Sequence, residues 1–261
     1  MNYVISASIA LACDSQLIEY QHQAHTLAQD LNLPLVTLPS PNYCYLLVLT
    51  DQRLELRCPA ENWQAIAVDF LSPKTRYRQH KGGGKNQLIA KAVGMKKNYF
   101  PTILDATAGL GQDGFILASL GCSVTLVERS EILSVLLADG LQRLFAASPT
   151  IPISLITADA IDFFSKLSEQ SHPDVIYLDP MFPHQGKHAE VKKEMRLLRA
   201  IVGDDADAEV LLKQALLCAK KRVVVKRPRL APPLGQQPAD LVLTGRSGRF
   251  DIYFRKSPTP C

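Results

Sequence analysis

Two hydrophobic patterns alternate along most of the chain. Short apolar runs of the length of buried strands are separated by longer stretches in which apolar residues recur every three or four positions. The short runs predict strands at residues 102–107, 123–127, 153–158, 175–178 and 222–226. The longer stretches predict helices at residues 115–120, 131–145, 161–167, 188–202 and 207–219. Strands that alternate with helices are typical of a parallel sheet with helices on both faces.

The two ends of the chain follow other patterns. Residues 240–244 and 250–254 are strand-like runs whose short link, Gly245-Arg246-Ser247-Gly248, predicts an antiparallel hairpin. Residues 1–72 predict a small α/β lobe, with strands at 3–8, 45–50, 53–57 and 65–70 and a helix at 16–29. Between the lobe and the main domain at 102–261, residues 73–101 predict a basic, Gly-rich bridge that opens a helix at 86–93.

A glycine-rich turn follows the strand at 102–107. Gly109 and Gly111 let the backbone turn sharply and approach a ligand without a Cβ in the way. Glu128, at the end of the next strand, lies 19 residues beyond Gly109. This is the distance of about 20 residues expected between a nucleotide-binding glycine turn and the carboxylate that holds a ribose diol. The sequence therefore predicts a site for a ligand that contains adenosine.

Acidic residues end four of the predicted strands, namely Asp105, Glu128, Asp159 and Asp179. Because ligands of an open α/β sheet lie beyond the carboxyl ends of its strands, we expect these side chains to line one crevice. Asp179 begins the sequence Asp179-Pro180-Met181-Phe182. A carboxylate and a neighbouring carbonyl can accept both hydrogens of a nucleobase amine and direct its lone pair at a methyl donor, and an aromatic ring can stack on a flipped base. We therefore predict that Asp179, Pro180 and Phe182 form the catalytic loop.

Composition narrows the class of protein. The apolar fraction of 47% and the charged fraction of 21% are ordinary for a globular protein, and no run of 18 apolar residues occurs. The six cysteines show no C-x-x-C pair and no neighbouring histidine cluster, which predicts reduced thiols, a cytoplasmic location and no metal site. Gly82-Gly83-Gly84-Lys85 is followed by Asn86 and not by Ser or Thr, which excludes a Walker phosphate loop.

Charge is distributed unevenly although the net charge is only +4. Residues 1–73 carry two basic and seven acidic residues, whereas residues 74–104 carry eight basic residues and no acidic one. A second block at 220–229 holds six basic residues and again no acidic one. Such blocks attract a phosphate backbone, so we expect a nucleic acid as partner.

Several sequence blocks together resemble one family, the ribosomal small-subunit methyltransferase J family of 16S rRNA (guanine(1516)-N2)-methyltransferases. The blocks are L-D-A-T-A-G-L-G-Q-D, D-P-M-F-P-H, V-K-K-E-M-R, R-V-V-V-K-R-P, A-P-P-L and R-F-D-I-Y. The resemblance implies a Rossmann-like class I S-adenosylmethionine-dependent methyltransferase sheet, whose parallel strands end in an antiparallel hairpin. It also implies S-adenosyl-L-methionine as methyl donor and a guanine N2 of 16S rRNA in the small ribosomal subunit as acceptor.

The same resemblance assigns roles to individual residues. Donor contacts map onto Gln112, Asp113, Glu128, Arg129, Asp159, Ala160 and Asp179. Asp105, Gly109 and Gly111 are expected to contact the donor because of their place at the strand end and in the glycine turn. By their chemistry, Glu128 is expected to hold the ribose and Asp159 the adenine amine. RNA contacts are expected at Lys81, Lys85, Lys226 and Arg227. The chain departs from the usual Asp/Asn-Pro-Pro-aromatic pattern at Met181, which replaces the second proline.

Three alternatives remain open on the sequence. Residues 109–114 also match G-x-G-x-x-G, which would suit an NAD-dependent oxidoreductase. A non-catalytic rRNA-binding or assembly factor could keep a vestigial pocket. Methylation of adenine N6 or of a protein glutamine would use the same Asp-Pro-x-aromatic chemistry.

Overall fold

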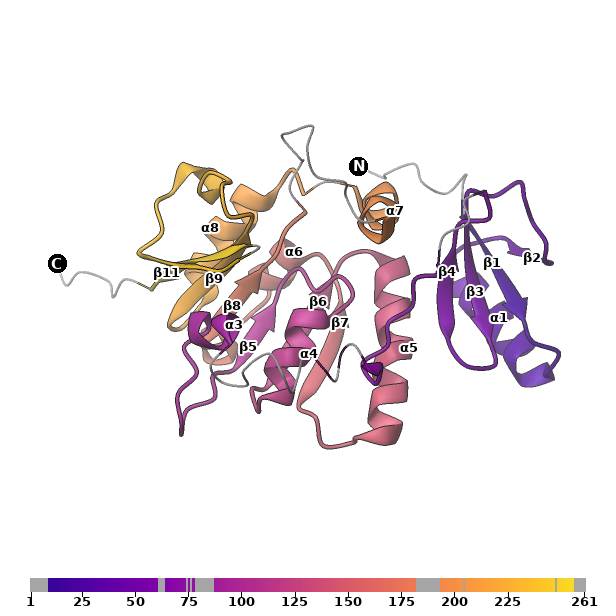
Figure 1. The fold of residues 1–261 in the computed structure, drawn as a ribbon, viewed down its shortest axis with the longest axis horizontal. Helices are drawn as coiled ribbons and strands as arrows, with labels where there is room; N and C mark the ends of the chain where they lie inside the picture. The colour runs from indigo at the N-terminus through magenta and orange to yellow at the C-terminus, as the bar shows by residue number, and fades with distance from the viewer. Residues whose placement is uncertain are drawn as a thin grey trace.

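The fold of this computed structural model contains two separate sheets (Figure 1). The structure describes residues 9–60, 64–73, 75, 77, 87–181, 193–203, 205–246 and 248–255, and for 193–197 only the backbone. The larger sheet has seven strands in the order β10-β11-β9-β8-β5-β6-β7. Its strands are β5 (Ile103–Asp105), β6 (Val124–Glu128), β7 (Ile153–Thr157), β8 (Val175–Leu178), β9 (Arg222–Arg227), β10 (Leu241–Thr244) and β11 (Arg249–Phe254).

The strand directions agree with the sequence-based prediction. The strand pairs β5–β6, β6–β7, β5–β8 and β8–β9 are all parallel, whereas β11 is antiparallel to both β9 and β10. All four residues of β8 are buried, as expected for a central parallel strand that is covered on both faces. The prediction of a class I methyltransferase sheet with a terminal antiparallel hairpin is therefore confirmed.

Helices cover both faces of the large sheet. The helices α3 (Leu88–Ala92), α4 (Gln112–Ser119) and α5 (Glu131–Ala147) pack into one apolar core, while α6 (Ala160–Ser165) and α8 (Ala208–Cys218) pack into a second core on the other face. The helix α7 (Lys193–Val202) lies above α5 at the top of the view in Figure 1. The described part of the chain also holds the short 3-10 helices η2 (Glu169–Ser171) and η3 (Leu234–Gln236). No helix among the described residues has the length and apolar character needed to cross a membrane.

The helix α4 begins earlier than the predicted 115–120. Gly111 precedes it in the left-handed conformation, with φ of 68°, so the helix starts directly at Gln112. A Cβ on Gly111 would come within 2.6 Å of Leu137 Cδ1, and one on Gly114 within 2.4 Å of Leu126 Cδ2. The two glycines therefore bring α4 close to its neighbours, and the turn before α4 stays tight.

The small sheet holds four strands in the order β2-β1-β3-β4. They are β1 (Ile9–Asp14), β2 (Leu35–Val36), β3 (Tyr45–Thr50) and β4 (Leu54–Arg57), and α1 (Ile18–Asp30) packs against them. The predictions at 45–50, 53–57 and 16–29 are close to the observed elements. The strand predicted at 3–8 lies outside the described residues, and the strand at Ile9–Asp14 was missed.

The strand predicted at 65–70 is wrong. This segment makes one bridge, between Ile66 and Leu56, and no continuous ladder. Ile66, Val68 and Phe70 are nevertheless buried while the residues between them are partly exposed. The alternation arises because the segment lies against helices of the large domain, where Phe70 stacks on Phe115 with ring centroids 4.8 Å apart. An alternation of apolar and polar residues therefore shows that one side of a segment is buried. A segment can be buried on one side without belonging to a sheet.

The contact between this connecting segment and α5 is close. A Cβ on Gly140 would lie 2.4 Å from Val68 Cγ1 and 3.0 Å from the Val68 carbonyl oxygen. That carbonyl oxygen accepts a hydrogen bond from the Arg143 guanidinium. The predicted limits 1–72, 73–101 and 102–261 stay predictions, but residues 66–70 are attached to the large domain by specific packing.

Gly140→Ala tests this contact through the sign of its effect. In an unobstructed helix the substitution would stabilise the protein by about 1 kcal/mol. Here overpacking against Val68 costs about 1–3 kcal/mol, so we expect a net loss of unfolding free energy. Urea unfolding followed by circular dichroism measures the change.

Ala138→Gly is the matched control, because Ala138 lies on the exposed face of the same helix. It is expected to lose about 1 kcal/mol from helix propensity alone. A Gly140→Ala variant more stable than the parent would show that Val68 does not occupy this place in solution.

Candidate active site

A cavity of about 500 Å³ opens at the carboxyl ends of the parallel strands. Its lining includes ten of the residues predicted from the sequence: Asp105, Gly109, Gln112, Asp113, Glu128, Arg129, Asp159, Ala160, Asp179 and Lys226. Four predicted strand ends thus meet in one crevice. Phe182, Lys81 and Lys85 lie outside the described residues, so their roles stay predictions.

The glycine turn leaves one wall of the cavity open. Gly109 has φ of 55°, and a Cβ built on it would meet no atom within 4 Å. Its N–H donates to Glu128 Oε2 at 2.7 Å, while the Ser130 N–H donates to Glu128 Oε1 at 2.8 Å. Burial raises the pKa of the Glu128 carboxyl, and these two backbone bonds oppose the rise. Each oxygen keeps a second lone pair, so the fixed carboxylate can still accept a hydrogen bond from a ligand hydroxyl.

A group of buried polar side chains lies beside the turn. The Tyr177 hydroxyl donates to Asp113 Oδ2 at 2.8 Å, and both side chains are almost inaccessible to solvent. Asp105 is only 2% exposed, and burial, reinforced by the Asp113 charge, raises the pKa of its carboxyl well above the usual range. A raised carboxyl pKa favours the protonated form, so Asp105 resists ionisation more than an ordinary aspartate does.

Asp179 is held from two sides at the end of β8. Its backbone N–H donates to Thr107 Oγ1 at 2.6 Å, and its Oδ2 accepts from Lys226 Nζ at 2.7 Å. The side chain keeps 39% of its surface accessible where it lines the cavity. Burial raises the pKa of the Asp179 carboxyl, Lys226 lowers it, and Asp113 raises it again. Pro180, which follows, is buried.

Arg129 connects the donor side of the cavity to the segment before α8. Its guanidinium pairs with Asp205, with Asp207 at 2.8 Å and with Asp159 at 3.8 Å. Burial by itself would lower the pKa of the guanidinium, but Asp205 and Asp207 raise it above its usual value. Arg129 was predicted to contact the donor, and the structure shows it engaged with three carboxylates in the lining.

Asp205 also holds the loop that is predicted to be catalytic. The Met181 N–H donates to Asp205 Oδ2 at 2.5 Å, and the Asp205 N–H donates to the Met181 carbonyl oxygen at 3.2 Å. A proline at position 181 could not make the first of these bonds, because proline has no N–H. Met181 thus replaces the restraint of a proline ring by a hydrogen bond to a carboxylate that Arg129 holds in turn.

The structure describes the surroundings of two of the residues that are predicted to contact RNA. Lys226 points into the cavity, where Nζ is 2.8 Å from Asp113 Oδ2 and 2.7 Å from Asp179 Oδ2. Arg227 is 5% exposed and donates to the Pro232 carbonyl oxygen beneath the loop that follows β9. In this conformation the Arg227 side chain is covered, so an RNA contact would require that loop to move.

Sequence reasoning missed four residues of the site: Thr107, Tyr177, Asp205 and Asp207. Acidic residues before a helix are common, so Asp205 and Asp207 before α8 do not stand out in the sequence as site residues. The partners of Asp205 and Asp207 lie far away in the sequence, which no local pattern can indicate. Thr107 and Tyr177 belong to predicted strand segments, where a hydroxyl within an apolar run is a weak signal of function.

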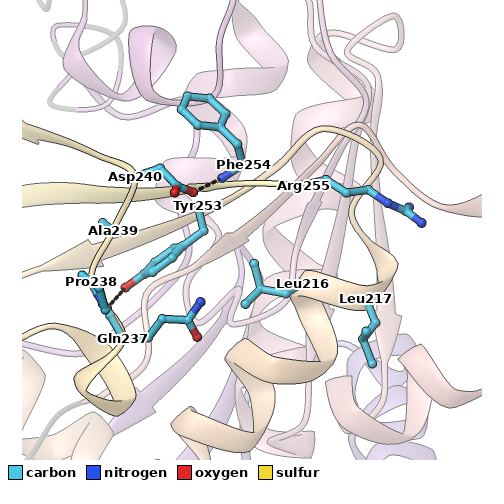
Figure 2. A pocket seen from close by; sticks show the side chains of 9 residues that line it. All are labelled: Leu216, Leu217, Gln237, Pro238, Ala239, Asp240, Tyr253, Phe254 and Arg255. Carbon is cyan, nitrogen blue, oxygen red and sulfur yellow. Dashed lines mark hydrogen bonds between the residues drawn. The ribbon is translucent and has the colours of Figure 1, made fainter. Parts of the chain in front are cut away.

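A second cavity, of about 620 Å³, lies near the amino end of β9. Figure 2 shows the side chains that line it. It adjoins Phe254, which pairs with Arg222 at the start of β9. Its polar groups are occupied in local structure, since the Tyr253 hydroxyl donates to the Gln237 carbonyl oxygen and Asp240 accepts from the Phe254 N–H. We therefore locate the chemistry in the first cavity. Within the described ranges no group of three potential ligands is arranged to hold a metal ion.

The residues of the first cavity fit S-adenosylmethionine. Seven carboxylates and two cations line it, which suits a ligand with a sulfonium and an ammonium group. The open face of Gly109 admits the close approach of a ligand, and Glu128 presents a fixed acceptor beside it. Val127, Leu133 and Ile161 are among the apolar residues of the lining.

Comparison with known proteins agrees with this geometry. The family model for SAM-dependent methyltransferases matches residues 26–255. The ribosomal RNA small subunit methyltransferase J of Coxiella burnetii is 48% identical over 237 residues, which cover 90% of this chain and 92% of that protein. The protein of the same name from Nitrosococcus oceani is 46% identical over 249 residues, covering 93% and 97%.

A solved structure gives the same result at the level of the fold. The SAM-dependent methyltransferase of Neisseria gonorrhoeae superposes with a TM-score of 0.72 at 36% identity, covering 97% of this chain and 98% of that one. This similarity spans both sheets. The chain therefore belongs to the S-adenosylmethionine-dependent methyltransferases and, within them, to the small-subunit methyltransferase J family.

Proposed function

We propose that this protein transfers a methyl group from S-adenosylmethionine to the exocyclic N2 of one guanosine in the 16S rRNA of the small ribosomal subunit. The observation that carries the proposal is the position of Asp179. It shares one cavity with the glycine turn and Glu128, and it begins an Asp-Pro loop of the kind used to methylate amines. The names of the relatives, ribosomal RNA small subunit methyltransferase J, support rRNA as the substrate.

The chemistry requires positioning more than strong base catalysis. The lone pair of a guanine N2 is delocalised into the ring, so the amine is a poor nucleophile. Asp179 Oδ1 and the loop backbone can accept the two N2 hydrogens and direct the lone pair toward the methyl carbon. S-adenosylmethionine supplies an activated methyl group when it is bound. The protein holds the amine, excludes water and accepts the proton that N2 loses.

Cationic residues at the same edge of the sheet support an RNA substrate. Arg229 is exposed in the loop that follows β9, and Arg246 is exposed in the hairpin turn beside β9. Both lie near the strand end that carries Lys226. Phosphate contacts of this kind orient a nucleic acid without reading its sequence.

The alternatives that the sequence left open differ in how well they agree with the family. Membership in a methyltransferase family argues against an NAD-dependent oxidoreductase. A non-catalytic assembly factor, adenine N6 methylation and protein-glutamine methylation differ from the proposal in their product. Mass spectrometry of nucleosides from small subunits treated with enzyme and isotopically labelled donor separates them. N2-methylguanosine supports the proposal, whereas N6-methyladenosine, labelled protein or no label contradicts it.

Asp179→Asn removes the carboxylate and keeps the shape of the side chain. We expect kcat to fall by about 100-fold or more, because the amide accepts the N2 hydrogens less strongly and cannot take up a proton. Single-turnover methylation of small subunits measures the effect.

Asp174→Asn is the control, because Asp174 pairs with Lys221 at the far edge of the sheet. It should leave kcat within about twofold of the parent. Full activity of Asp179→Asn would contradict the proposal that Asp179 positions the amine.

Asp205→Ala tests the restraint on the catalytic loop. The variant loses the carboxylate that accepts the Met181 N–H, so the loop should sample more conformations and kcat should fall by about 10–100-fold. Kd for RNA should change little, because Asp205 lies inside the cavity lining. Single-turnover rates and filter binding measure the two quantities.

Asp207→Ala is the matched control. Asp207 also pairs with Arg129, at 2.8 Å, but it makes no hydrogen bond to Met181. An equal loss of kcat in both variants would assign the effect to Arg129 and would contradict a specific role of the Met181 contact.

A further inference from the structure

Lys226 has an unusual place for a basic residue at the end of a strand. Its ammonium group bridges two carboxylates, with Nζ 2.8 Å from Asp113 Oδ2 and 2.7 Å from Asp179 Oδ2. These carboxylates come from different parts of the fold, because Asp113 lies in the first turn of α4 and Asp179 follows β8. One cation therefore connects the turn predicted to bind the donor with the loop predicted to bind the acceptor.

The bridge is anchored on the Asp113 side. Asp113 Oδ2 accepts a second hydrogen bond from the Tyr177 hydroxyl, whose own side chain is 1% exposed. Asp179 is fixed at its backbone by the bond from its N–H to Thr107 Oγ1. With both carboxylates held, Lys226 has little freedom to turn out of the cavity toward an RNA phosphate.

We infer that Lys226 is a positioning residue, which fixes the Asp179 carboxylate through Oδ2 in its ionised form and leaves Oδ1 to the substrate amine. This inference rests on the proposed function, since it concerns how Asp179 receives an amine. It replaces the RNA contact expected for Lys226 from the sequence. Lys226 itself touches neither partner of the reaction in this assignment.

The charges around Asp179 explain why a cation is needed there. Asp113 on α4, Asp105 on β5 and Asp205 before α8 all face the same region, and the Tyr177 hydroxyl on β8 lies among them. Burial, Asp113 and Asp205 raise the pKa of the Asp179 carboxyl, and Lys226 lowers it. Without Lys226, the carboxyl would take up a proton at a higher pH and lose its ability to accept an N2 hydrogen.

The same surroundings exclude Lys226 as the base. Burial alone would lower the pKa of its ammonium group, but Asp179 and Asp113 raise it above its usual value. Lys226 therefore stays protonated through the reaction. As the bond between the methyl carbon and the donor sulfur breaks and the bond to N2 forms, N2 becomes cationic, and its proton then passes to Asp179 Oδ1 and from there to water.

The test is the pH dependence of kcat at saturating donor, measured from pH 5 to 9 by methylation of small subunits. Because Asp179 acts as a carboxylate, kcat rises with pH through its pKa and then levels off. Lys226→Met should move this rise to higher pH by about 1–3 units, since an opposite charge at this distance shifts a pKa by that amount. Asp113→Asn should move it to lower pH, because it removes a neighbouring negative charge.

Opposite shifts of the pH profile in these two variants would show that Lys226 positions Asp179. If Lys226 only supported the structure, both substitutions would lower stability and would not shift the pH profile in opposite directions. Lys226→Arg keeps the charge, so its kcat should rise with pH near the pH at which that of the parent rises. This variant provides the test if Lys226→Met does not fold. Lys221→Met is the matched control, because Lys221 directly precedes the same strand and pairs with Asp174 at 3.1 Å, away from the cavity. Its pH profile should not move.

A parental pH profile in Lys226→Met would overturn the inference, and so would shifts of the same sign in Lys226→Met and Asp113→Asn. A lower RNA affinity in Lys226→Met with an unchanged pH profile would also overturn it, and would return Lys226 to the predicted RNA contact. None of these results affects the proposed function, which fails only if the parent protein does not form N2-methylguanosine.

Discussion

Carboxylates gathered at the ends of parallel strands have to be kept ionised in a partly buried cavity, and two cations make this possible. Removing a carboxylate from water raises its pKa, and each further carboxylate nearby raises it again. Lys226 compensates Asp113 and Asp179, and Arg129 compensates Asp159, Asp205 and Asp207. Among the described residues, no hydrogen bond joins Asp105 to a cation, and burial raises the pKa of its carboxyl well above the usual range. The pKa values of these carboxyl groups therefore depend on where the two cations lie.

The two cations also set the geometry of the site, because each joins elements that are distant in the sequence. Lys226 joins β9 to α4 and to the loop after β8. Arg129, next to Glu128 at the end of β6, joins the donor side to Asp205 and through it to Met181. The loop proposed to be catalytic is therefore held at Asp179 by one network and at Met181 by the other. A loop restrained at both positions keeps its acceptor atoms in place before a substrate arrives, which is the condition for catalysis by positioning.

Local patterns in the sequence were sufficient for the sheet and for the outline of the cavity. The glycine turn, the spacing to Glu128 and the Asp-Pro loop depend on residues that are close together in the chain, and all of them line one cavity or adjoin it. The partners of these residues could not be predicted in this way. Arg129 and Asp205 are 76 residues apart, and Lys226 and Asp113 are 113 apart. The strand expected at 65–70 failed for the opposite reason, because its alternating burial comes from packing on helices and not from a ladder.

Met181 shows how a departure from a family pattern can be compensated by distant residues. A second proline would restrict φ at position 181 through covalent geometry alone. Met181 leaves φ free but provides an N–H, and Asp205 uses it. The restraint then depends on the charge of Asp205, which Arg129 stabilises, and Arg129 follows the very strand residue that is expected to hold the donor ribose. In this chain, therefore, the restraint on the loop proposed to be catalytic is linked electrostatically to the side of the cavity where the donor is expected, a connection that a proline could not provide.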